Sequence, residues 1–111
     1  MKNHLLVFFL VLLSALQFSA FADGDPAKGK SIYATCIACH GQNGEGLQAT
    51  NSPRLAGLHD WYLIRQLQYF KAGIRGDPKD KFAMEMRVKA IIGISGEKDI
   101  KDLAAYLSSI E

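Results

Sequence analysis

The chain has 111 residues, 49% of them hydrophobic, so it has room for one domain with a small core and too few residues for a second. Its 13 lysines and arginines only slightly outnumber its 11 aspartates and glutamates, and the basic residues are scattered along the sequence. A nucleic-acid-binding protein would gather them in a run or on one face, so we expect no nucleic acid among the partners.

The first 22 residues have the features of an export signal. Lys2 and His4 form a short basic start, Leu5–Leu13 is an unbroken apolar run, and Ala20–Ala22 has the small-x-small pattern of a cleavage site. A retained membrane anchor is the alternative, but the apolar run is shorter than the roughly 20 residues that span a bilayer. We therefore predict cleavage after Ala22, no stable membrane anchor, and one domain over residues 23–111.

The first predicted helix lies close to the start of that domain. Asp25 is a good N-cap and Pro26 suits the first helical position, so a helix is expected from there to about Ala38. From Gly41 to Gly57, several glycines and a Ser-Pro pair interrupt any regular pattern, which predicts a loop.

A second helix is expected between Asp60, as its N-cap, and Gly73, where it should end. The apolar residues expected to pack on this helix are Trp61, Leu63, Ile64, Leu67 and Phe70. Further on, the run Gly-Asp-Pro at residues 76–78 predicts a turn. The stretch from Phe82 to Ile92 is ambiguous and is expected to be a loop that gives way to a short helix.

The last helix is expected to run from Ser95, as its N-cap, to the C-terminus, with Glu97 and Asp99 favourably placed in its first turn. One apolar stripe at helical spacing follows this helix and consists of Ile100, Leu103, Ala104, Leu107 and Ile110. No segment shows the period-two alternation of a strand, so the predicted fold class is all-α.

Both cysteines of the chain lie in the short stretch from Thr35 to Gly46, together with a histidine. Cys36, Cys39 and His40 spell CxxCH, the spacing of a c-type haem attachment site. Two thiols at this spacing can each bond to one vinyl-derived carbon of a haem, which brings the adjacent histidine under the iron. The sequence therefore predicts one covalently bound haem c, with His40 as an axial ligand of its iron.

Three other interpretations of the motif are weaker. A disulfide would close a very small loop, would gain little chain entropy, and has no use for His40. A thioredoxin-like dithiol needs a preceding strand and a βαβ context, which the helical pattern lacks. A zinc site needs four ligands, and beyond these three only His59 remains as a donor.

A low-spin electron carrier needs a second axial ligand. Met1 would be lost with the signal, which leaves Met84 and Met86 as the methionines of the mature chain. A thioether from one of them would give His/Met ligation, which raises the reduction potential and fills both axial positions. Residues two apart point in nearly opposite directions, so we expect only one methionine to face the iron. His59 is a competing ligand, and both methionines could instead be core filler.

These residues resemble the class I c-type cytochromes of the bacterial periplasm, in particular the small single-haem proteins similar to one half of the dihaem cytochromes c. The resemblance rests on YATCIACHGQNGEG around the motif, PRLAGLHDWYLIRQLQYFKAGIRG in the middle, MEMR, and KDIKDLAAYLSSI at the end. It covers essentially the whole mature chain and implies the class I cytochrome c fold, with helices packed around one haem.

The resemblance also implies roles for single residues. In MEMR, the methionine directly before the arginine looks like the family's axial ligand, which favours Met86. The family usually has fewer residues between this methionine and the last helix, so Met84 stays an alternative. Pro53 matches the proline whose carbonyl accepts a hydrogen bond from the proximal histidine, and Arg54 is a candidate partner for a haem propionate.

Three further residues resemble a packing contact of the same fold. Gly29 and Tyr33 on the first helix, with Tyr106 on the last, match the place where two helices of the family cross closely. We assign these three residues to packing.

The implied function is that of a soluble periplasmic electron carrier, not an enzyme. Its partners would be other redox proteins, such as a quinol-oxidising complex, a terminal oxidase or a periplasmic reductase, met in small transient interfaces. Two alternatives stay open: a haem-based gas sensor or peroxidase-like module whose sixth position opens, and an electron-entry subunit of a larger enzyme.

Overall fold

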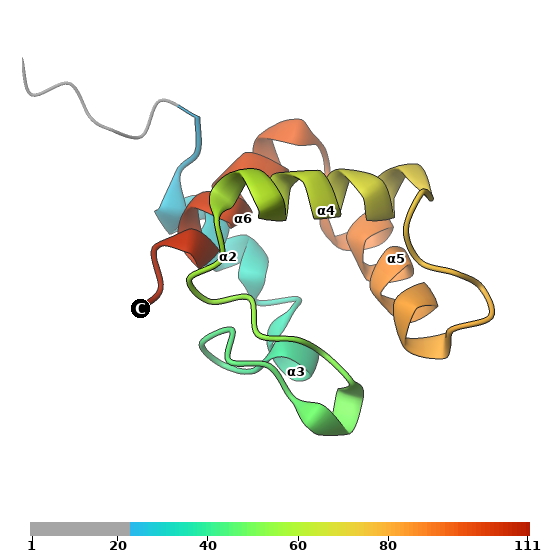
Figure 1. The fold of residues 1–111 in the computed structure, drawn as a ribbon. Helices are drawn as coiled ribbons and strands as arrows, with labels where there is room; N and C mark the ends of the chain where they lie inside the picture. The colour runs from blue at the N-terminus through green and yellow to red at the C-terminus, as the bar shows by residue number, and fades with distance from the viewer. Residues whose placement is uncertain (1–22) are drawn as a thin grey trace, which may run out of the picture.

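The computed structural model describes residues 23–111, so the predicted export signal lies outside the described residues. In chain order the elements are α2 (Pro26–Tyr33), α3 (Ile37–His40), the 3-10 turn η1 (Gln48–Thr50), α4 (Asp60–Ala72), α5 (Lys81–Gly93) and α6 (Glu97–Ser108). Figure 1 shows α4 lying across the molecule, with α3 and α5 beneath it and α2 crossing α6. The described residues contain helices and a single isolated β-bridge, which confirms the all-α prediction.

Helix α2 begins as predicted and ends earlier than predicted. Asp25 caps it, since its Oδ1 accepts a hydrogen bond from the Ala27 N–H at 2.9 Å. The helix ends at Tyr33 and not near Ala38, and the chain turns before it restarts as α3. One cause is Thr35, whose hydroxyl donates to the Ile32 carbonyl at 3.1 Å and so competes with the helical backbone for that acceptor.

The crossing of α2 and α6 is the close contact that the sequence predicts. Gly29 is buried there, and a Cβ atom at this position would lie 1.9 Å from the Asp102 carbonyl oxygen. The rings of Tyr33 and Tyr106 meet beside it with centroids 5.6 Å apart. The Tyr33 hydroxyl donates to the Gly41 carbonyl at 2.6 Å, which ties α2 to the loop after α3. The predicted packing role of the glycine and the two tyrosines is confirmed.

Helix α6 buries four of the five residues of the predicted stripe, begins one residue later than predicted and ends at Ser108, so that Ile110 lies beyond the helix and is only partly buried. Gly96 occupies the N-cap position. Ser95 precedes the N-cap and does not cap the helix; its backbone N–H donates to the Asp99 carboxylate in the first turn at 3.1 Å. The buried apolar residues of the helix are Ile100, Leu103, Ala104 and Leu107.

Helix α4 ends at the predicted glycine, and one of its aromatic residues departs from the prediction. Gly73 closes the helix with a left-handed φ of 74°, which glycine adopts without a steric cost. His59 takes the N-cap position and Asp60 is the first helical residue. Trp61, expected to pack, is 58% exposed because the buried face of the helix consists of Leu63, Leu67 and Phe70 at helical spacing.

Helix α5 replaces the expected loop and short helix with 13 helical residues. Asp80 caps it, since its Oδ1 accepts hydrogen bonds from the Phe82 and Ala83 N–H groups at 3.0 and 3.1 Å. The predicted turn lies just before this cap, where the Asp80 N–H donates to the Asp77 carbonyl at 3.0 Å. Apolar residues occur on every side of α5 and only Ala90 is buried, so the sequence shows no clear helical stripe.

No helix within residues 23–111 is both long and apolar enough to cross a membrane.

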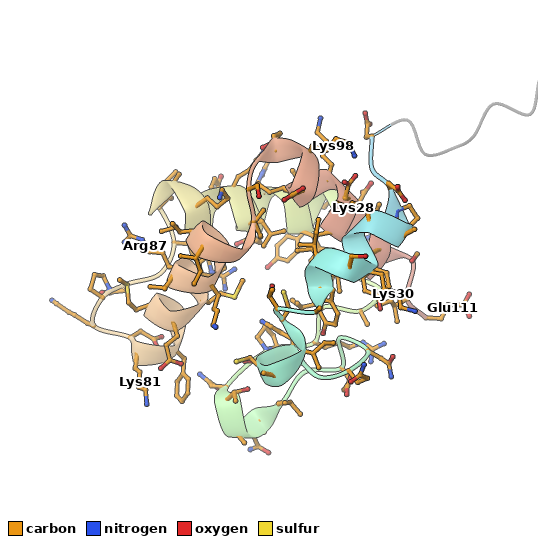
Figure 2. All side chains as sticks on the ribbon, turned by 180° about the vertical axis from the view of Figure 1, so that it is seen from behind. Lys28, Lys30, Lys81, Arg87, Lys98 and Glu111 are labelled. Carbon is orange, nitrogen blue, oxygen red and sulfur yellow. The ribbon has the colours of Figure 1, made fainter. Side chains whose placement is uncertain are left out.

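A buried carboxylate joins the start of the domain to its last helix. Asp102, 1% exposed, accepts a hydrogen bond from the Asp25 N–H at 2.8 Å and is paired with Lys98 at 2.8 Å. Figure 2 shows Lys98 and Lys28 near each other at this end of the molecule. The Asp25 N–H, followed by the lysine, holds the pKa of Asp102 below its ordinary value.

Adding one methyl group at the crossing should strongly destabilise the protein. In Gly29→Ala the new Cβ would overlap the Asp102 carbonyl, and α2 would have to move away, at a cost of about 2–3 kcal/mol or more. Gly96→Ala is the matched control, because a Cβ there meets nothing within 4 Å, and its cost should stay below about 1 kcal/mol. Urea denaturation measures both, and similar values for the two variants would contradict the packing argument.

The Asp102 carboxylate should make stability depend on pH. Because its pKa is depressed in the folded state, it stabilises the fold at neutral pH, and this contribution is lost as the pH falls below about 4 through the folded-state pKa. We expect Asp102→Asn to lower the free energy of unfolding at pH 7 and the difference from wild type to shrink toward pH 3. A difference that stays constant between these two pH values would argue against this linkage.

Candidate functional site

A cavity of about 550 Å³ lies between α3 with its following loop, α4 and α5. Figure 1 shows these elements, with α4 above and α3 and α5 on either side. Its volume falls within the roughly 300–1,000 Å³ that is usual for small-molecule and cofactor sites. The apolar residues along it include Leu55, Leu58, Leu63, Leu67, Phe70 and Leu107.

Both cysteines line this cavity as free thiols. Cys36 stands at the N-cap of α3, and the Cys39 N–H donates to its carbonyl at 3.2 Å, so one short helical turn sets their spacing. Burial raises the pKa of Cys36, and the Thr35 hydroxyl, 3.7 Å from its sulfur, partly opposes that shift. The turn therefore presents both thiols to an apolar space.

His40 follows them at the end of α3 and is only 6% exposed. Its Nδ1 lies 2.9 Å from the carbonyl oxygen of Pro53. Since a carbonyl can only accept, Nδ1 carries the proton, and Nε2 keeps the lone pair that can ligate a metal. Burial lowers the pKa of His40, which favours the same neutral form, while the hydrogen bond partly opposes the shift.

The loop that supplies Pro53 is held against α3 by polar contacts that sequence reasoning did not identify. The Thr50 hydroxyl donates to the Cys39 carbonyl at 2.8 Å. Leu47 and Ser52 exchange two backbone hydrogen bonds of 3.0 Å, which close the loop on itself. No sequence signal marks Thr50, because its partner carbonyl becomes apparent only in the folded structure.

Two arginines line the cavity, one predicted and one not. Arg54 is exposed, and its Nε donates to the Ala56 carbonyl at 3.1 Å. Arg75, which sequence reasoning did not single out, lies over the Phe70 ring with its Cζ 4.7 Å from the centroid. Its Nη1 donates to Gln66 at 2.6 Å, and the glutamine also lines the cavity.

Both candidate methionines line the cavity from α5. Of the two, Met86 packs against the hydrophobic core, and it lies one turn before the buried Ala90 on the same face of the helix. His59, the competing candidate, is placed elsewhere: it is exposed at the start of α4 and its ring stacks on Trp61 with centroids 6.0 Å apart.

The chain is similar to known proteins over most of its length. Residues 26–111 match the family Cytochrome c. Cytochrome c4 of Azotobacter vinelandii is 37% identical over 101 residues, which cover 90% of this chain and 48% of that protein. Cytochrome c-554(548) of Halomonas halodenitrificans is 39% identical over 88 residues, covering 79% of this chain and 99% of that protein.

The fold is similar as well. The crystal structure of reduced recombinant cytochrome c4 from Pseudomonas stutzeri aligns with a TM-score of 0.64 and 27% identity, over 79% of this chain and 50% of that one. The chain therefore spans about half the length of the cytochromes c4 that it matches.

The residues around the cavity fit the cofactor of this family. A c-type haem needs two thiols, an imidazole with an available ring nitrogen, and an apolar space, and Cys36, Cys39 and His40 line such a space. Because the family match spans residues 26–111, the chain belongs to the cytochrome c family, whose haem is bound covalently.

Proposed function

We propose that the protein is a periplasmic electron carrier with one haem, whose iron is ligated by His40 and Met86. The observation that carries this proposal is the position of the two side chains, both of which line one apolar cavity from different elements. A sulfur and an imidazole in such positions can occupy both axial sites of an iron, which favours electron transfer over substrate binding.

On the α3 side, this chain's residues would attach the haem and orient the ligating imidazole. Cys36 and Cys39 would form the two thioether bonds, and His40 would present Nε2 while its Nδ1–H donates to Pro53. That hydrogen bond fixes the tautomer and the ring orientation, so the ligating nitrogen is ready before any metal arrives. When bound, the haem supplies an iron that takes up and releases one electron.

On the α5 side, we assign the sulfur ligand to Met86. Its contact with the core and the buried Ala90 one turn later show that this face of α5 is turned toward the core. Met84 also lines the cavity, but it is not among the residues packed against the core. The apolar walls of the cavity disfavour the extra positive charge of the oxidised iron. This effect would raise the reduction potential.

The charged residues and the chain's surroundings complete the proposal. We propose Arg54 as a partner for a haem propionate, since it lines the cavity with a guanidinium group.

We also propose cleavage of the signal after Ala22, a location in the periplasm without a stable anchor, and one domain over residues 23–111. The single CxxCH motif of the sequence supports one haem.

Proposed partners are other redox proteins, such as a quinol-oxidising complex, a terminal oxidase or a periplasmic reductase, and no nucleic acid. A carrier must release each partner after the electron has moved, which small and transient interfaces allow. The described residues carry charges of both signs around the cavity, including Arg54, Arg75 and Lys89 beside Asp80 and Glu85.

The mass of the exported protein tests cofactor number and processing together. Mass spectrometry of the chain purified from its own host should give the polypeptide starting at Asp23 plus one haem. Cys36→Ala with Cys39→Ala should remove the covalent haem, because both thioether sulfurs are then absent. A second haem, or a wild-type chain with none, would contradict the single-haem assignment.

The sulfur ligand is tested by two matched variants. Met86→Ala should abolish the long-wavelength absorption band of the methionine–iron(III) bond and allow carbon monoxide to bind the reduced protein. Met84→Ala should keep the band and exclude carbon monoxide. The reverse pattern would assign the ligand to Met84, and carbon monoxide binding by the wild type would favour a sensor with an open sixth position.

A further inference from the structure

Helix α5 has few buried side chains to hold it in place. Of its residues only Ala90 is buried, and among the described elements the helix packs chiefly against α4. Apolar burial is therefore a weak determinant of where α5 lies. Polar contacts at its C-terminal half are better placed to fix it.

Lys71 makes such contacts. It is half-buried in the last turn of α4, and its ammonium group donates to the Ala90 carbonyl at 3.4 Å and also to the Ile94 carbonyl. The last carbonyls of a helix have no partner within the helix, and the helix dipole places negative potential at that end. The Lys71 ammonium from α4 donates to these carbonyls and places a positive charge at the negative end of the helix dipole. It therefore joins the two helices where α5 ends.

Arg87, in the middle of the same helix, lies close to the connection between α4 and α5. A Cβ atom on Gly73 would lie 2.5 Å from the arginine's Nη2, and one on Gly76 would lie 2.6 Å from its Cβ. Both glycines also have positive φ values, 74° and 100°. The arginine therefore lies over two positions without side chains in the connection from α4, and Figure 2 shows it at the edge of α5.

We propose that Lys71 is a positioning residue for the sulfur of Met86. The carbonyl of Ala90, which Lys71 binds, belongs to the residue one turn after Met86 on the same face. Holding that turn against α4 fixes how far the methionine reaches into the cavity. This inference rests on the proposed function, because it assumes that Met86 is the ligand.

Without this contact, α5 would more often occupy positions in which the sulfur has left the iron. An external ligand can bind the iron only while α5 is in one of those positions, so its apparent affinity measures how often they are occupied. Imidazole is a suitable probe, because it competes with methionine for the sixth site of the oxidised protein. Its binding is followed by absorbance and does not depend on electron-transfer activity.

The test compares three lysine variants of the haem-loaded protein. Lys71→Met keeps the length of the side chain but cannot donate, and should raise imidazole affinity about tenfold, the effect expected for losing a charged hydrogen bond. Lys71→Arg retains a donor and should restore most of the wild-type affinity. Lys79→Met removes an equal charge from the exposed α4–α5 connection and should change nothing.

A double-mutant cycle separates this inference from the proposed function. If Lys71 acts through Met86, then Lys71→Met should have no further effect on imidazole affinity in a Met86→Ala background. Equal imidazole affinity in Lys71→Met and Lys79→Met would overturn the positioning role, even if Lys71→Met unfolds at a lower temperature. Retention of the methionine–iron band in Met86→Ala would instead overturn the ligand assignment on which the inference rests.

Discussion

The hydrogen bond from His40 to Pro53 is the constraint on which the site depends. It determines which ring nitrogen is available, and it joins the end of α3 to a loop 13 residues further along the chain. The loop in turn is anchored through Thr50 to the Cys39 carbonyl. Thiol spacing, imidazole orientation and loop shape are thus parts of one network, in which a change at one residue is transmitted to the others.

The two sides of the cavity are held in different ways. The α3 side is fixed by short-range hydrogen bonds within the stretch from Cys36 to Pro53. The α5 side depends on a helix that buries little and that Lys71 and Arg87 join to α4. Under the proposed ligation, the histidine ligand would lie on the rigid side and the methionine ligand on the more loosely held side.

Local signals in the sequence predicted most of the fold. Asp25 before Pro26, Gly73 at a helix end and the stripe of α6 each determine structure within a few residues, and the structure agrees with them. The end of α2 could not be predicted in this way, because Thr35 competes for a backbone carbonyl. The full length of α5 was missed because its apolar residues occur on every side of the helix. At the site, CxxCH is contiguous and was recognisable, whereas Thr50 and Arg75 gain their partners only through folding.

The crossing of α2 and α6 joins the two ends of the domain, and this has a consequence for the order of folding. Gly29 and the Asp25 N–H find their partners in residues near the C-terminus, at Asp102 and Tyr106. A chain that emerges N-terminus first must therefore be delivered as far as α6 before α2 can dock. Until then the two thiols, directly after that helix, lie on a segment without its tertiary partner, open to whatever machinery attaches a tetrapyrrole.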